Sequence, residues 1–236
     1  YIQSKGRTNS VKMWAVGQTM ALERSLSLFA DPRRGTEGMF PEFYFLDCHT
    51  CHRRISDDPR FTPDALANPG RPIPAGMPAF NDENMIMLSA AARVVAPGLA
   101  QRFDRDSRAF HQAMGRDRSA AVAAAATLRD SARALGQAFT SANLGRSQAF
   151  AIIEAIAGAA ISDRFTDYAG SVQAVMATDT LLSALVNDGA VSAAQAQAIR
   201  GDINAAYQAV RDPNAYEPRA FRASLGRAAA AIKRLG

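Results

Sequence analysis

The residues most able to do chemistry lie in one ten-residue stretch, Phe43–His52. It contains both cysteines of the chain, Cys48 and Cys51, and two of its three histidines, His49 and His52. Residues three and four apart on a helical turn share a face, so Cys48, Cys51 and His52 can point together. The order Cys-x-x-Cys-His is the attachment pattern of a c-type haem, in which two sulfurs bond the porphyrin edge and the imidazole bonds the iron. The stretch therefore predicts one covalent haem c with His52 as the proximal ligand.

The residues in front of the cysteines agree with this prediction. Asp47 can cap the helical turn that carries the motif. Phe43, Tyr44, Phe45 and Leu46 supply the apolar surface that a large planar cofactor needs. We expect Tyr44 and Phe45 to contact the haem.

Two cysteines at this spacing have three other interpretations: a redox dithiol, half of a zinc site, and a chance occurrence. A redox dithiol is expected beside a βαβ pattern, and none is found in the sequence. Half of a zinc site, completed by His49, His52 or His111, lacks a second pair of ligands at finger-like spacing. A chance occurrence is disfavoured because both cysteines of the chain fall in one five-residue motif.

The sixth position of the iron has three possible states. Met77 lies in the proline-rich loop 72–80, which is stiff enough to hold a thioether in place. His111 lies at the edge of an apolar stripe on a predicted helix, and we expect a helix-surface histidine there rather than a ligand. The third possibility is an open iron. Met77 is the preferred ligand, and a core-filling methionine is the alternative role for it.

Arginines close to the motif in sequence can pair with the haem propionates, since a guanidinium binds a carboxylate through two hydrogen bonds. Arg71, beside the proline-rich loop, is the best of these. The other arginines near the motif are Arg53, Arg54 and Arg60.

The order of these motifs resembles the class I cytochromes c. Those proteins carry Cys-x-x-Cys-His, then a loop with the methionine ligand, then a helix that opens with acidic residues. Gly76–Phe80, followed by Asn81-Asp82-Glu83-Asn84, is similar to that ending, and the resemblance covers residues 40–96. It implies thioether bonds at Cys48 and Cys51, axial ligands His52 and Met77, and a haem contact at Phe80. The chain departs from the family in the short span between His52 and Met77, and residues 97–236 have no counterpart.

Composition limits the class of protein. A hydrophobic fraction of 48% supplies a substantial core for 236 residues. The net charge of +5 allows acidic protein partners or anionic lipid, or simply a solvated mixed surface. No nucleic-acid motif is present. The basic residues are almost all arginine, because Lys5, Lys12 and Lys233 are the only lysines.

No stretch reaches the ~18 uncharged apolar residues that a spanning helix needs, so we expect no transmembrane segment. No signal peptide is recognised at Tyr1. Because c-type haem is attached outside the bacterial cytoplasm, the motif alone predicts a periplasmic or otherwise extracytoplasmic protein.

Apolar periodicity predicts an all-α fold. Residues 1–96 form the expected haem region: a helix over 9–30, the motif, the proline-rich loop, and a helix capped by Asn81 that ends before Pro97. Residues 97–236 form an Ala-rich helical bundle of unknown role. Its predicted helices cover 98–114, 117–140, 142–160, 166–187, 191–211 and 215–235.

These features favour an electron carrier that docks on redox partner proteins, or an electron-transfer subunit of a larger complex. A haem enzyme is the alternative, and it requires an open or His111-ligated iron. A sensor or structural protein that uses the haem as a staple is the third hypothesis. The large helical region keeps that hypothesis open.

Overall fold

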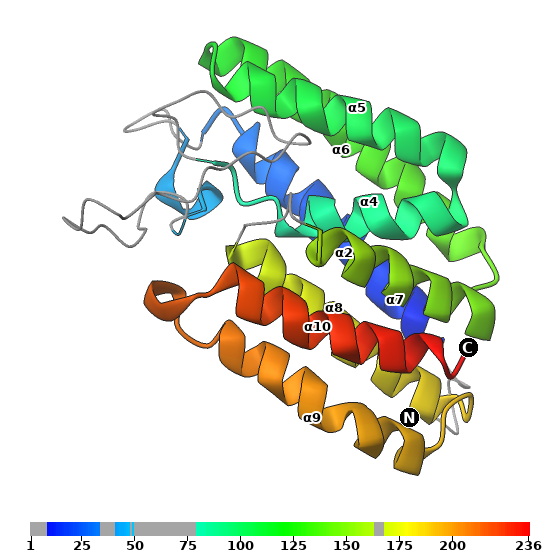
Figure 1. The fold of residues 1–236 in the computed structure, drawn as a ribbon. Helices are drawn as coiled ribbons and strands as arrows, with labels where there is room; N and C mark the ends of the chain where they lie inside the picture. The colour runs from blue at the N-terminus through cyan, green and yellow to red at the C-terminus, as the bar shows by residue number, and fades with distance from the viewer. Residues whose placement is uncertain (1–8, 34–40, 48, 50–78, 163–167) are drawn as a thin grey trace.

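The computed structural model describes residues 9–33, 41–47, 49, 79–162 and 168–236 (Figure 1). In these ranges the chain forms eight α-helices and two short 3₁₀ helices, with one isolated β-bridge and no strand, so the all-α prediction is confirmed. The α-helices are α2 (Ser10–Phe29), α4 (Glu83–Val95), α5 (Pro97–Met114), α6 (Arg118–Ser141), α7 (Arg146–Ala160), α8 (Tyr168–Asn187), α9 (Ala193–Ala209) and α10 (Pro218–Lys233). The 3₁₀ helices are η1 (Phe43–Phe45) and η2 (Pro213–Ala215).

Local signals explain where most helices begin and end. The Asn9 side chain accepts the Lys12 N–H at 2.8 Å, as an N-cap does, and this confirms the predicted start of α2. Ser192 and Gln195 form a reciprocal capping box on α9. Gly189 ends the turn after α8 with φ +72, a conformation that L side chains rarely adopt.

The start of α4 differs from the prediction by one residue. Asp82, not Asn81, is the N-cap, and helical geometry begins at Glu83. The reason is a tertiary hydrogen bond: the Asn81 N–H donates to the Phe45 carbonyl at 2.8 Å. This contact holds Asn81 outside the helix.

Helix α2 packs along α6, and small residues allow the two to come close. A Cβ on Gly136 of α6 would lie 2.9 Å from Thr19 Oγ1 of α2. Figure 1 shows α5 beside α6, and α10 beside α9 across the bundle. One buried cluster contains residues from α2, α4 and every later α-helix, so the core extends across the predicted boundary at 96/97.

Helix α8 is long and apolar enough to cross a membrane, but 56% of its apolar window is buried within the protein. It also carries Asp179, which pairs with Arg200 of α9 at 2.7 Å. A core helix of a soluble bundle has the same properties. The expected absence of a transmembrane segment therefore stays a prediction.

Candidate haem site

Two backbone hydrogen bonds join the chain in front of the cysteine motif to the chain behind the proline-rich loop. The Asp47 N–H donates to the Ala79 carbonyl at 2.8 Å, and the Asn81 N–H donates to the Phe45 carbonyl at 2.8 Å. Between them, Leu46 and Phe80 form an antiparallel bridge. We call residues 45–47 with 79–81 the clasp.

The clasp brackets the predicted site in sequence. Cys48, Cys51, His52, Arg71 and Met77 lie between its two sides and outside the described residues. The attachment motif begins directly after Asp47, and Met77 stands two residues before Ala79. The clasp therefore joins the two ends of the segment that contains every predicted haem-bonding residue.

A cluster of four phenylalanines joins the clasp to the helices. Phe45 and Phe80 come from the clasp, Phe29 from the end of α2, and Phe110 from α5, and all four are at most 3% exposed. The ring centroids of Phe80 and Phe110 lie 4.9 Å apart, and those of Phe29 and Phe45 lie 5.3 Å apart. Edge contacts of this kind contribute ~0.5–1.5 kcal/mol each beyond burial. The cluster fixes the clasp to the helical bundle.

The aromatic residues in front of the motif divide between core and surface. Phe45 is 3% exposed, whereas Phe43 is 70% exposed and Tyr44 is 52% exposed. The Tyr44 ring lies against Phe45, with centroids 3.9 Å apart. Of the four residues of the predicted apolar wall, Phe45 is thus buried, Leu46 is half-buried, and the rings of Phe43 and Tyr44 are open to a cofactor or to solvent.

Asp47 and His49 connect the motif to the C-terminal helices. Asp47 Oδ1 accepts the His49 N–H at 3.0 Å, the contact that an N-cap makes with the second residue after it. The His49 ring meets the Tyr168 ring of α8 edge to face, with centroids 4.5 Å apart. Tyr168 is fixed in turn, because its hydroxyl donates to the Val210 carbonyl at 3.0 Å.

Carboxyl groups gather beside the clasp. Asp47 and Asp82 are buried, at 6% and 4% exposure. Burial raises the pKa of Glu83, and the charges of Asp47 and Asp82 raise it further, while a hydrogen bond with Gln173 of α8 lowers it. The side of the clasp that faces α8 is therefore acidic.

The expectation of a helix-surface position for His111 is wrong, because the residue is only 2% exposed. Its Nδ1 lies 2.8 Å from the Ser107 carbonyl, which can only accept, so Nδ1 carries a proton. Its Nε2 lies 3.3 Å from Asp82 Oδ2 but is buried and makes no hydrogen bond. Both ring nitrogens thus face groups of the protein.

No group of three or more His, Cys, Asp or Glu side chains that could hold a metal ion occurs among the described residues. Sequence reasoning did not identify Phe29, Phe110 or Tyr168 as neighbours of the site. Each lies on a helix far from the motif in sequence, and no local pattern distinguishes it from an ordinary core aromatic. Comparisons with protein-family models, curated proteins and solved structures found no match for this chain.

Proposed function

We propose that this chain is a mono-haem c-type cytochrome that transfers electrons. Cys48 and Cys51 would hold haem c through thioether bonds, with His52 and Met77 as the axial ligands. The clasp is the observation that carries the proposal. It joins the start of the Cys-x-x-Cys-His motif to the end of the Gly-Met-Pro loop. One haem with ligands from both motifs requires that these two parts of the chain be held together.

The described residues around the clasp fit such a cofactor. Phe45 and Phe80 are buried aromatic side chains at the two ends of the segment that contains the predicted ligands, and Phe29 and Phe110 pack against them. The half-exposed Tyr44 offers a ring beside the motif. A bound haem c supplies one-electron exchange at its iron, and His/Met ligation raises its reduction potential.

The position of His111 favours Met77 as the distal ligand. The Ser107 carbonyl holds its Nδ1 at 2.8 Å, and an iron would have to displace the Asp82 carboxylate, 3.3 Å away, to reach its Nε2. A haem enzyme or sensor with an open or His111-ligated iron is the second candidate. Two observations among the described residues favour it: His111 is buried, and its Nε2 makes no hydrogen bond.

The proposed function also predicts where the protein is located and what kind of partner it binds. Covalent haem attachment implies an extracytoplasmic, bacterial protein. With both axial positions filled, the iron would exchange electrons with a redox partner protein rather than bind a small molecule.

The test is the absorption spectrum of the chain expressed with a c-type haem maturation system. We expect a haem that survives acid-acetone extraction, shows the charge-transfer band of methionine on ferric iron, and resists cyanide. The band should vanish in Met77→Ala and persist in His111→Gln. The matched cysteine variants, Cys48→Ala and Cys51→Ala, should each lose one thioether bond.

The outcomes separate the candidates. A covalent haem that binds cyanide at once, with no effect of Met77→Ala, would favour the enzyme or sensor. Loss of ligation in His111→Gln with retention in Met77→Ala would assign His111. Absence of haem from the matured protein would refute the proposal.

A further inference from the structure

The outward side of α5 is unusually basic. Arg102, Arg105 and Arg108 follow one another at three-residue spacing, so they lie within about 120° of the helix circumference. The side chains of Arg102 and Arg105 are 47% and 67% exposed, and Arg108 is exposed. The three guanidinium groups therefore occupy one open face over about two turns.

One buried carboxylate of α5, Asp106, pairs with two of these arginines, Arg102 and Arg105. Asp106 has a side chain only 7% exposed, and its Oδ2 accepts a hydrogen bond from Ser131 Oγ of α6 at 2.5 Å. The same carboxylate lies 3.5 Å from Arg102 Nε and 3.1 Å from Arg105 Nη2. The Asp106 carboxylate is therefore buried, and the more exposed Arg102 and Arg105 guanidinium groups lie next to it.

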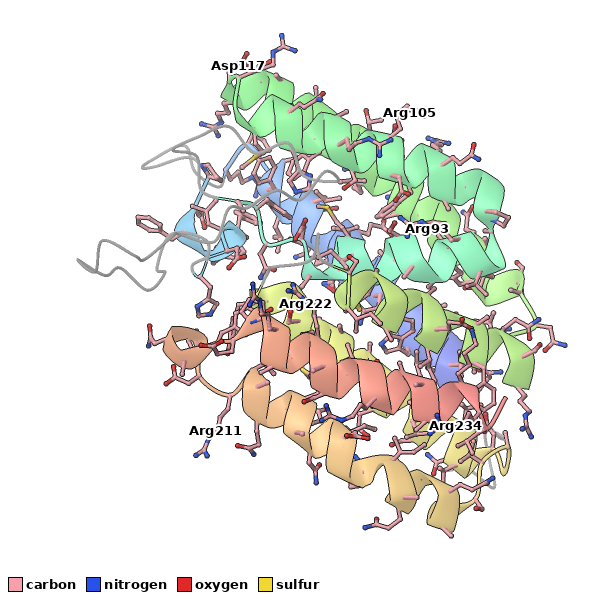
Figure 2. All side chains as sticks on the ribbon, in the orientation of Figure 1. Arg93, Arg105, Asp117, Arg211, Arg222 and Arg234 are labelled. Carbon is pink, nitrogen blue, oxygen red and sulfur yellow. The ribbon has the colours of Figure 1, made fainter. Side chains whose placement is uncertain are left out.

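Arg93 of α4 extends the basic surface. Its Nη2 lies 3.1 Å from Asp104 Oδ2, whose side chain is 23% exposed while that of Arg93 is 55% exposed. Asp104 is fixed by Ser89 Oγ at 2.5 Å. Figure 2 shows Arg105 on the outer edge of α5 and Arg93 on the neighbouring α4. We call Arg93, Arg102, Arg105 and Arg108 the arginine face.

Helix α10 is also basic but is built differently. Arg227 pairs with Asp202 and Lys233 pairs with Glu154, and these carboxylates are 34% and 58% exposed. Exposed acids cancel the positive charge at the surface itself. The arginine face has four guanidinium groups and only two paired carboxylates, Asp104 and Asp106, at 23% and 7% exposure, so it keeps a net positive charge.

The composition of the face selects the kind of partner. Large apolar side chains that are exposed in the described part of the chain are Met13, Met20, Phe43, Tyr44, Ile161 and Met176, and none is on α4 or α5. A helix that binds a lipid surface needs apolar anchors on the same face as its cations. Fixed guanidinium groups without such anchors match carboxylates, which they bind through two hydrogen bonds.

We propose that the arginine face docks an acidic patch on a redox partner protein. The inference rests on the proposed electron-transfer function. The arginine face lies on the side of α5 that points away from the clasp. Phe110 contacts Phe80 of the clasp, and Arg105 lies about 140° away from Phe110 around the axis of α5. The thickness of α5, ~10–12 Å with side chains, therefore lies between the centre of the arginine face and the clasp. Because Asp104 and Asp106 hold three of the arginines in place, docking has less side-chain entropy to lose.

The first test is binding of a fluorescent decaglutamate peptide to the full chain at low salt. We compare Arg102→Gln/Arg105→Gln/Arg108→Gln with a control of equal charge on α10, Arg219→Gln/Arg227→Gln/Lys233→Gln, which includes both cations that pair with exposed acids. Each exposed ion pair contributes up to about a fivefold change in affinity, so the α5 variant should bind about tenfold more weakly or worse. The control should change affinity by less than about threefold, and salt should abolish the difference.

Two further variants distinguish a loss of binding from misfolding of the triple variant. Arg108→Gln has no hidden carboxylate to uncover and should still weaken binding severalfold, at an unchanged melting temperature. Arg105→Lys keeps the charge but loses the two-pronged contact, and it should weaken peptide binding less than the triple variant. Equal losses in the α5 and α10 variants would overturn the proposal. So would tighter, α5-dependent binding to phosphatidylcholine–phosphatidylglycerol vesicles or to duplex DNA.

A redox measurement connects the face to the proposed haem. Oxidation of the reduced protein by the ferricyanide trianion should slow more in the α5 variant than in the α10 variant at low salt. Equal rates with intact peptide binding would overturn the role of the face in electron transfer. Peptide binding needs no haem, so a failed haem spectrum and a failed docking test remain distinguishable.

Discussion

Replacement of Phe80 tests whether the clasp maintains the axial ligation of the proposed haem. Phe80 is 1% exposed and forms the bridge with Leu46. Its ring centroid lies 4.9 Å from Phe110, 5.8 Å from Phe29 and 6.1 Å from Phe45. Phe80→Ala removes these contacts and leaves a cavity, at a cost of about 3–5 kcal/mol in the free energy of unfolding. For a chain of this size, that corresponds to a melting temperature lower by about 6–20 °C.

The prediction separates the site from general stability through a matched control. Phe139 on α6 is 0% exposed and lies outside the phenylalanine cluster, so Phe139→Ala should cost a similar free energy of unfolding. We expect only Phe80→Ala to weaken the methionine charge-transfer band and to let cyanide bind. The milder Phe80→Leu keeps the burial but loses the aromatic edges, and it should show a partial effect. Equal ligation in the Phe80 and Phe139 variants, measured well below their melting temperatures, would refute a role for the clasp.

Two further predictions concern the scaffold. Gly201→Ala on α9, where nothing lies within 4 Å of the added methyl group, should stabilise the fold by about 1 kcal/mol in urea unfolding. Gly136→Ala should show that gain only together with Thr19→Ala, because Thr19 Oγ1 lies 2.9 Å from the new Cβ, and an additive double-mutant cycle would contradict this. The raised pKa of Glu83 means that the folded state holds its proton more tightly, so stability falls as pH rises from its ordinary value of 4.5 through the raised one. Glu83→Gln should therefore gain in unfolding free energy over wild type as the pH rises from 4.5 through the raised pKa of Glu83, and a pH-independent difference would contradict the assignment.

Most of the helical architecture could be predicted from local signals. Asn9, Pro97 and Gly189 mark helix ends through capping, the fixed φ of proline and positive φ, and each of these acts within a few residues. The start of α4 was misplaced because the Asn81 N–H is used by Phe45, a partner far away in the sequence. The error therefore lies where a tertiary contact competes with a local one.

The surroundings of the site could not be predicted for the same reason. His111 lies at the border of an apolar stripe, and the sequence alone does not show that it is buried, with its Nε2 3.3 Å from Asp82 Oδ2. Phe29 and Phe110 are core-type residues at helical spacing, and the sequence does not indicate that they meet at the clasp. The motif predicts the chemistry of a site, whereas long-range packing determines its neighbours.

The clasp also has a consequence for the engineering of this chain. Residues 47 and 79 are directly paired in an antiparallel manner, which is how the two ends of a hairpin meet. A two-residue Asn-Gly turn is long enough to connect such ends. The described helical scaffold can therefore be closed by a short turn between Asp47 and Ala79, and a chain made in this way would test whether the bundle folds without the intervening segment.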